Sequence, residues 1–188
     1  MKSCHSELTM SVSNTTSVTN NFYEQSRFHN LKTRWNLWAH LPQDPDWSTK
    51  SYKLVYQFTN IEETIAITES LPEGLVKNCM LFIMRDGIIP MWEDSKNRNG
   101  GCFSYKVSNK NVFEVWRDIT YTLVGESISN NNLFINNVTG ITISPKKNFC
   151  ILKIWMTNCD YQNPQIVTED IKNLSSHGCL FKKHTPEF

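Results

Sequence analysis

A tryptophan stands directly before two acidic residues in the stretch DGIIPMWEDSKNRNGG, which runs from Asp86 to Gly101. Trp92 offers a large aromatic face, and Glu93 and Asp94 offer carboxylates that accept hydrogen bonds. Such a combination suits a ligand with a flat ring and hydrogen-bond donors, whether that ring is a base or a sugar. The alternative interpretation is a tryptophan of the core beside two solvated acids. The stretch is polar and ends in glycines, which favours an exposed loop.

The numbers of tryptophans and of charges narrow the kinds of ligand. The chain has 6 tryptophans in 188 residues, more than the packing of one domain needs, so some of them are expected to serve a site. The net charge is only +1, whereas proteins that follow a long phosphate backbone are usually clearly basic. A nucleic-acid ligand should therefore be short and be held by its own chemistry.

The start of the chain and its cysteine pattern favour an intracellular protein. No stretch is apolar for long enough to cross a bilayer, and the first residues lack the basic and apolar regions of a signal peptide. The 6 cysteines show no C-x-x-C pair and no metal spacing, so we expect free thiols in a reducing compartment. We therefore predict a cytoplasmic protein without a membrane anchor, a metal site or a cofactor.

Strand patterns dominate the chain after a polar beginning. Residues 1–27 are rich in serine, threonine and asparagine and predict a flexible tail, so we place the folded domain at residues 28–188. The first strand is predicted over residues 51–58, where an apolar side chain stands at every second position from Tyr52 to Phe58. Further strands are predicted over residues 80–85, 102–107, 140–144, 149–156 and 179–184.

Helix signals occur at three places. Asn60 is followed three residues later by Glu63, which predicts a capped helix start. A second helix is predicted over residues 111–125, between an asparagine–glutamate capping pair and a glycine. A third is predicted over residues 163–178, because proline stands at its first position. The second helix would bury Val112, Trp116, Ile119 and Leu123 and expose Arg117, Asp118 and Tyr121.

The balance of these elements predicts a fold class. Strands outnumber helices, and most connections have the length of hairpins. We therefore expect an α+β domain, in which a mainly antiparallel sheet carries its helices on one face. The other face of the sheet would then be free to bind a ligand.

Five stretches of the chain resemble the mRNA cap-binding initiation factor 4E family, and they occur in the family's order and at near-family spacing. The resemblance extends from about His29 to the end of the chain. It implies a curved, mainly antiparallel sheet with three helices on the convex side and a slot for the cap on the concave side. The stretches are HNLKTRWNLW (29–38), DGIIPMWED (86–94), NRNGG (97–101), VWRDITYTLVGE (115–126) and KIWMTNC (153–159).

The resemblance implies roles for four residues of the slot. Trp92 and Trp47 would stack on the two faces of 7-methylguanine, and Glu93 would accept hydrogen bonds from the N1–H and the exocyclic amine. Trp155 would lie against the N7-methyl group, although a tryptophan of the core is the alternative there. The methylated base is a cation, so a cation–π attraction of ~0.5–2 kcal/mol adds to a stacking energy of about 1–3 kcal/mol.

The basic residues for a triphosphate depart from the family pattern. By position, Lys146 replaces an arginine, and Ile151 stands where the family carries a lysine. Lys153 lies on the same strand face as Trp155 and is expected to take over that role, with help from Lys147. The alternative for Lys147 is a solvated charge in a turn. Further candidates for charge near the entrance of the slot are Lys182, Lys183 and His184.

On the convex side, the resemblance implies a docking surface for scaffold proteins. A valine and a tryptophan of the family's first helix become isoleucines here, and the second helix is more polar than in the family. These changes predict altered scaffold recognition, while the remaining apolar side chains still favour a partner. The residues concerned are His29, Leu31, Ile61, Ile65, Arg117, Asp118 and Tyr121.

The leading hypothesis is a monomeric cap-binding translation factor that recruits capped mRNA through a scaffold of the initiation factor 4G type or a divergent equivalent. A cap-sequestering repressor that lacks normal scaffold binding is a close alternative. A carbohydrate-binding module is a second alternative, because a tryptophan beside an acid also suits a sugar ring. An enzyme is disfavoured, since no metal cluster and no glycine-rich phosphate loop accompanies the acids.

Overall fold

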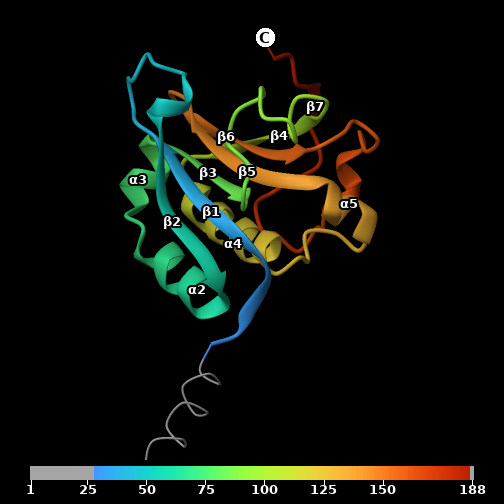
Figure 1. The fold of residues 1–188 in the computed structure, drawn as a ribbon, viewed down its shortest axis with the longest axis horizontal. Coiled ribbons are helices and arrows are strands. Elements are labelled where there is room, and N and C mark those ends of the chain that lie inside the picture. The colour runs from blue at the N-terminus through green and yellow to red at the C-terminus, as the bar shows by residue number, and fades with distance from the viewer. Residues whose placement is uncertain (1–27, 187–188) are drawn as a thin grey trace, which may run out of the picture.

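A computed structural model describes residues 28–186, so the tail predicted at residues 1–27 lies outside the described residues. Its strands form one sheet in the order β2-β1-β3-β5-β6-β4-β7, with antiparallel pairing throughout (Figure 1). The strands are β1 (Asn30–His40), β2 (Tyr52–Asn60), β3 (Met80–Arg85), β4 (Gly101–Ser108), β5 (Val138–Pro145), β6 (Phe149–Met156) and β7 (Leu180–Lys183). The helices are α2 (Ile61–Ser70), α3 (Glu73–Asn78), α4 (Val112–Val124) and α5 (Asn132–Asn137), with short 3-10 turns η1 (Thr49–Ser51) and η2 (Pro164–Ile166).

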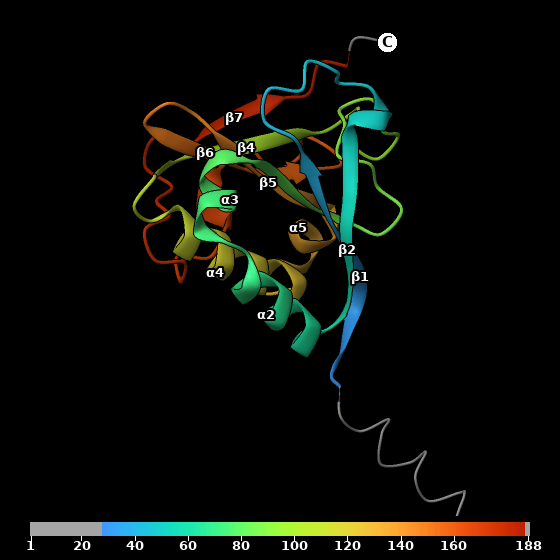
Figure 2. The ribbon, with the colours of Figure 1, turned by 90° about the vertical axis from the view of Figure 1, so that its left-hand side faces the viewer.

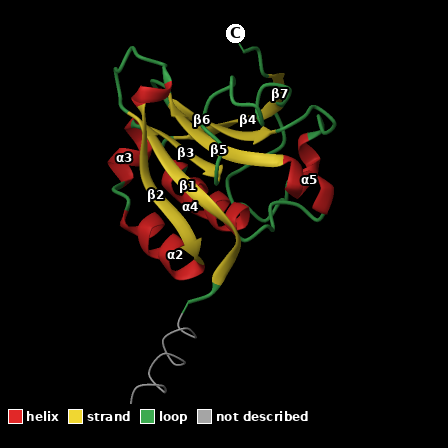
Figure 3. Ribbon diagram, in the orientation of Figure 1, coloured by secondary structure: helices red, strands yellow, loops and turns green. Residues whose placement is uncertain are grey.

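The sheet is curved and has its helices on one side. Helices α2, α3 and α4 cover one face, as Figure 2 shows, while α5 lies at the beginning of β5 (Figure 3). All six predicted strands are present, and β1 is added to them. The predicted α+β class is confirmed. We call the face opposite the helices the concave face.

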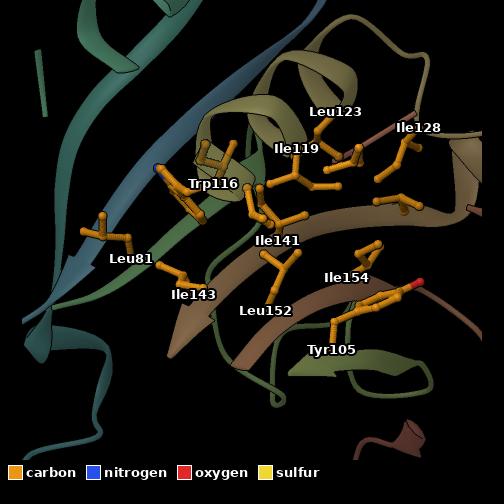
Figure 4. Close-up of a cluster of buried hydrophobic side chains, with 14 of the residues drawn as sticks. Leu81, Tyr105, Trp116, Ile119, Leu123, Ile128, Ile141, Ile143, Leu152 and Ile154 are labelled. Carbon is orange, nitrogen blue, oxygen red and sulfur yellow. The ribbon is translucent and has the colours of Figure 1, made fainter. Parts of the chain in front are cut away.

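Two hydrophobic clusters lie on the two sides of the sheet. The main core packs α4 against the sheet, and Trp116, Ile119 and Leu123 are buried in it as predicted (Figure 4). Burial of each such side chain contributes about 1.5–3 kcal/mol. The smaller cluster lies on the concave face and contains Phe82, Met84, Ile88, Cys102 and Trp155, with Trp38, Tyr52, Met80 and Trp92 packed against it.

The helix starts follow the predicted capping signals only in part. Asn60 caps α2 as predicted, because its side-chain oxygen accepts a hydrogen bond from the amide of Glu63 at 2.8 Å. The capping pair predicted for α4 is wrong. The side chain of Asn111 makes no capping hydrogen bond, and the Glu114 carboxylate instead accepts one from Asn173 at 3.1 Å. The helix still ends at the predicted glycine.

The helix predicted over residues 163–178 is also wrong, since only the turn η2 forms at its start. The amide of Thr168 donates to the carbonyl of Ile128 at 2.9 Å, and the Thr168 hydroxyl donates to Asp170 at 2.8 Å. These bonds replace the helical hydrogen-bond ladder. Pro164 does stand at the start of η2, but a proline start signal does not make the residues after it helical.

A partly buried ion pair joins β3 to the end of α4. Arg85 donates two hydrogen bonds to the Glu126 carboxylate, at 2.6 and 2.9 Å, and a third to the carbonyl of Val138 at 2.8 Å. Its guanidinium also lies 4.4 Å from the ring centroid of Trp35. Burial alone would raise the pKa of Glu126, but the hydrogen bonds and charge of Arg85 outweigh it and lower that pKa. The pair therefore fixes the helix end to the sheet that carries the concave face.

Candidate ligand-binding slot

A cavity of about 930 Å³ opens on the concave face, and it brings together six of the seven residues predicted to bind the ligand. Its walls come from the loop after β1, from β3, from the loop between β3 and β4, and from β5 and β6. Lys147 is exposed and does not line the cavity. The six residues are Trp47, Trp92, Glu93, Trp155, Lys146 and Lys153.

The loop that carries the Trp92–Glu93 pair is held together by its own polar side chains. The Asp94 carboxylate accepts hydrogen bonds from the amides of Ile89 and Lys96, at 2.9 and 2.8 Å. The buried side chain of Asn97 donates to the carbonyls of Ile89 and Met91, at 3.1 and 2.9 Å. Asp94 and Asn97 therefore shape the loop, which leaves Glu93 as the acid of the pair that lines the cavity.

The start of this loop is tied to the sheet through one aspartate. Asp86 accepts hydrogen bonds from the side chains of Asn36 and Gln57, both at 3.1 Å, and it lies 3.1 Å from Arg34. The next residue, Gly87, has a φ of 78°, which residues with a side chain rarely adopt. Asp86 thus anchors the loop that carries Trp92, and Gly87 allows the chain to turn into it.

The loop that carries Trp47 is organised in a similar way. The Asp46 carboxylate accepts from the amide and the hydroxyl of Ser48, at 2.7 and 3.0 Å, and these bonds lower the pKa of Asp46. Trp47 itself is 54% exposed. One of its faces is stacked on the ring of the buried His40, with ring centroids 4.1 Å apart and an angle of 9°. Trp92, on the other wall of the slot, is also stacked on a histidine.

Trp92 is backed by His184, which follows the last strand. The two rings are stacked, with centroids 5.5 Å apart and an angle of 15°, and His184 also lies 4.9 Å from the ring of Trp155. Its Nδ1 bonds to the carbonyl of Asn97 at 2.7 Å. Burial lowers the pKa of His184. The expectation that His184 supplies charge at the slot entrance is therefore wrong, because the ring is buried and does not line the cavity.

Three lysines, from β6, β7 and the turn between β5 and β6, lie at or near the slot. Lys153 and Lys146 line the cavity, and the Nζ atoms of Lys182 and Lys153 lie 5.3 and 5.9 Å from the ring centroid of Trp92. Burial, followed by the charges of Lys146 and Lys182, lowers the pKa of Lys153. Only the pairing of β7 with β4 brings Lys182 here, since it sets Lys182 opposite Cys102.

Tyr52 is a slot residue that the sequence did not single out. It lines the cavity at the start of β2, and its ring contacts those of His40, Trp47 and Phe82 edge-on. Burial raises the pKa of Tyr52 to about 12, and the charge of Glu93 adds to the shift. The slot therefore has aromatic walls, one carboxylate and a basic end, which suits a flat cation that carries an anionic tail.

The residues predicted to contact a partner lie around α2 and α4. His29 is tied to the first turn of α2, because its amide and ring bond to the Glu62 carboxylate at 2.9 and 2.6 Å. Leu31 is half-buried against the core. Ile61 and Ile65 on α2 are 44% and 45% exposed. Two apolar side chains of this surface are thus accessible.

The neighbouring surface of α4 is polar, as predicted. The hydroxyl of Tyr121 donates to the Glu69 carboxylate of α2 at 2.9 Å, and Arg117 donates to Asp118 at 3.0 Å. Burial and the bond to Glu69 raise the pKa of Tyr121 to about 12. The bond between Tyr121 and Glu69 links the two helices at their surface.

Comparison with known families identifies the chain. A family model described as Eukaryotic initiation factor 4E matches residues 30–185, which include every strand and helix of the fold. The chain belongs to this family. The resemblance inferred from the motifs is thus confirmed.

Curated relatives match at moderate identity. Eukaryotic translation initiation factor 4E-2 of Schizosaccharomyces pombe is 31% identical over 141 residues, which are 70% of this chain and 55% of that protein. Eukaryotic translation initiation factor 4E of Homo sapiens is 27% identical over 146 residues, which are 74% of this chain and 65% of that protein. The chain thus spans between half and two thirds of the length of these relatives.

Solved structures of the family have the same fold. The Ascaris suum eIF4E-3 structure with an m2,2,7G cap has a TM-score of 0.66 at 17% identity, and the match covers 86% of this chain and 94% of that one. The schistosome eIF4E structure with m7GpppG and 4E-BP has a TM-score of 0.64 at 22% identity, over 71% and 75% of the two chains.

Within residues 28–186, no helix has the length and apolar character needed to span a membrane.

Proposed function

We propose that this member of the initiation factor 4E family binds the 7-methylguanosine cap of mRNA and acts in the recruitment of mRNA for translation initiation. The observation that carries the proposal is the single cavity lined by Trp47, Trp92 and Glu93. Two indoles and one carboxylate suit a flat, cationic base whose edge carries two hydrogen-bond donors. The relatives solved with cap analogues give a precedent for such a ligand in this fold.

In this proposal the base inserts between Trp47 and Trp92, on the indole faces opposite their histidines. Stacking on an aromatic side chain contributes about 1–3 kcal/mol, and the charge of the methylated base adds ~0.5–2 kcal/mol. Glu93 would accept hydrogen bonds from the N1–H and the exocyclic amine, and Trp155 would contact the N7-methyl group. Unmethylated guanine lacks the positive charge, so it should bind more weakly.

The phosphates would extend toward the basic end of the slot. We assign them to Lys146 and Lys153, which line the cavity, and to Lys182, which lies over Trp92. Lys147 would assist from the adjacent turn. Ile151, at the position where the family carries a lysine, offers no charge, so the contacts to phosphate differ from the family pattern.

The same proposal includes a protein partner on the helical side. A scaffold of the initiation factor 4G type, or a divergent equivalent, would dock on Ile61 and Ile65 with the flanking residues of α4. The factor would act as a monomer in the cytoplasm. Family membership agrees with a non-enzymatic factor and does not favour a carbohydrate-binding module or a cap-sequestering repressor.

Tryptophan fluorescence during titration with 7-methyl-GTP, with GTP in parallel, tests the proposal. We expect strong quenching by the methylated nucleotide and much weaker quenching by GTP. Trp92→Ala should weaken binding of 7-methyl-GTP by ~10-fold or more, because one stacking face is lost. Equal quenching by the two nucleotides would contradict the proposal.

Two neighbouring acids offer a matched control for the role of the carboxylate. Glu93→Gln should weaken binding of 7-methyl-GTP, because the NH2 group of the amide cannot accept the second hydrogen bond and the negative charge is lost. Asp94→Asn should act through the loop, since Asp94 bonds to the amides of Ile89 and Lys96. Its effect should therefore appear in the stability of the fold as well as in binding. Equal effects of the two changes on binding alone would rule out a specific role for Glu93.

A further inference from the structure

The concave face continues beyond the slot along β6, β4 and β7. Residues opposite each other in an antiparallel pair point to the same face of a sheet, so cross-strand rows can be followed away from Trp155. Phe149 lies six positions before Trp155 on β6, or about 20 Å along the strand. The first row joins Trp155, Cys102 and Lys182, the second joins Lys153, Ser104 and Leu180, and the third joins Ile151 and Lys106.

An aromatic ring with a cation above it stands at the far end of these rows. The Nζ of Lys106 lies 4.7 Å from the ring centroid of Phe149, and Lys106 is exposed. Phe149 and Ile151 are half-buried, and Leu180 on the edge strand is 69% exposed. Nucleobases stack on such rings, while an adjacent ammonium group suits the phosphate between two nucleotides.

The charge of these strands has one sign. The segments β4, β5, β6 and β7 contain four lysines and no aspartate or glutamate, and three of these lysines, Lys106, Lys153 and Lys182, lie in the rows of the concave face. The turn between β5 and β6 adds Lys146 and Lys147. Because the whole chain has a net charge of only +1, this side of the concave face is more basic than the rest of the protein. It is therefore complementary to a polyanion.

We propose that the strip formed by Ser104, Lys106, Phe149, Ile151 and Leu180, here called the exit strip, binds the first nucleotides of single-stranded RNA that follow the cap. The proposal rests on the proposed cap-binding function and extends it. The cap triphosphate would leave the slot over Lys153, and the exit strip begins in the row of Lys153 with Ser104 and Leu180 and has Lys106 and Phe149 at its far end. The phosphates would lie along the lysines and a base would stack on Phe149.

The test compares 7-methyl-GTP with a short capped RNA for the wild-type protein and for variants of the exit strip. The capped RNA should bind more tightly than 7-methyl-GTP. Phe149→Ala should remove about fivefold or more of that advantage, because the stacked base is lost, and should leave the affinity for 7-methyl-GTP unchanged. That unchanged affinity also shows that the variant has folded.

Salt dependence gives a second, independent measurement on an exposed residue. Lys106→Met should lower the slope of log affinity against log salt by about 0.7–1 for the capped RNA and leave the slope for 7-methyl-GTP as it was. Lys172→Met, an exposed lysine beside the Asn173 that bonds to α4, is the matched control and should change neither slope.

The outcomes separate the exit strip from the slot. If 7-methyl-GTP does not bind at all, the proposed function fails. If 7-methyl-GTP binds and the capped RNA binds no more tightly, the slot stands and the exit strip is refuted. Displacement of capped RNA from the strip by an acidic peptide as readily as by uncapped RNA would also overturn the proposal, since the surface would then bind any anion.

Discussion

The concave slot and the helical docking surface differ in how their side chains are held. Trp47 and Trp92 stand on loops that are pinned by internal hydrogen bonds, and each has a histidine ring behind it. On the helical side, Ile61 and Ile65 project from α2 with nearly half of their surface exposed. The aromatic walls of the slot are thus held in place by neighbouring rings and loop hydrogen bonds, whereas the two isoleucines are positioned by their helix alone.

This difference fits the ligands proposed for the two surfaces. A small planar ligand makes few contacts, so displacement of one aromatic wall removes much of its binding energy. A protein partner spreads its contacts over many side chains, of which only a few dominate. The replacement of a family tryptophan by Ile65 would therefore alter the proposed partner surface, whereas the slot retains both of its tryptophans.

The largest change should come from the ion pair that supports both surfaces. Arg85→Met leaves the partly buried Glu126 carboxylate with only the Thr33 hydroxyl as a partner, and we expect a loss of about 1.5–3 kcal/mol in the free energy of unfolding, measured with urea. Arg34→Met is the control, because the exposed pair of Arg34 with Asp86 should contribute less than about 1 kcal/mol. A similar loss in both variants would show that Arg85 is not the link between helix and sheet.

Replacement of the ring behind Trp47 should weaken the slot by a smaller amount. His40→Leu removes the stacked ring, so the affinity for 7-methyl-GTP should fall by about 0.5–1.5 kcal/mol, measured by fluorescence titration. His40→Phe keeps a ring and should restore most of the affinity, although it loses the bond to the carbonyl of Asp46. Failure of the phenylalanine to rescue binding would mean that the hydrogen bond, rather than the stacking, positions Trp47.

Acid should loosen the other wall, with a smaller effect. Because burial lowers the pKa of His184, the folded protein keeps this ring neutral, while the unfolded chain takes up a proton near its ordinary pKa of about 6.5. Stability contributed by His184 is therefore complete above that pH and is lost as the pH falls below it. Urea unfolding at about pH 7 and 5 should show a smaller pH dependence in His184→Phe than in the wild type. An identical dependence in both proteins would contradict a buried neutral histidine.

The smallest expected effect is on the slot when the docking surface is changed. Ile65→Lys places a charge on an exposed position, so the affinity for 7-methyl-GTP and the stability should stay within about 0.5 kcal/mol of the wild type. Binding of the scaffold partner, measured by co-purification, should be lost. A fall in cap affinity would show that the two surfaces are coupled rather than independent.

Much of the fold and of the slot could be predicted from local patterns. The buried face of α4 and the cap of α2 depend on residues within a few positions of one another, so the sequence displays them directly. The pair Trp92–Glu93 was singled out by residue type and Trp47 by the family resemblance, and the structure brings all three into one cavity. The wrong helix over residues 163–178 marks the limit, because its proline start signal is local, while the amide of Thr168 bonds to the distant carbonyl of Ile128.

The sequence by itself determined the chemistry of the slot: which aromatic, acidic and basic residues are available, and on which loops and strands they stand. Only the tertiary structure decided that a histidine ring stacks on each tryptophan and that Lys182 lies close to Trp92. His184 bonds to Asn97 across 87 positions, and Lys182 reaches Trp92 because β7 pairs with β4. Strand order and register are set by the packing of the whole sheet, and no short stretch of sequence carries that information.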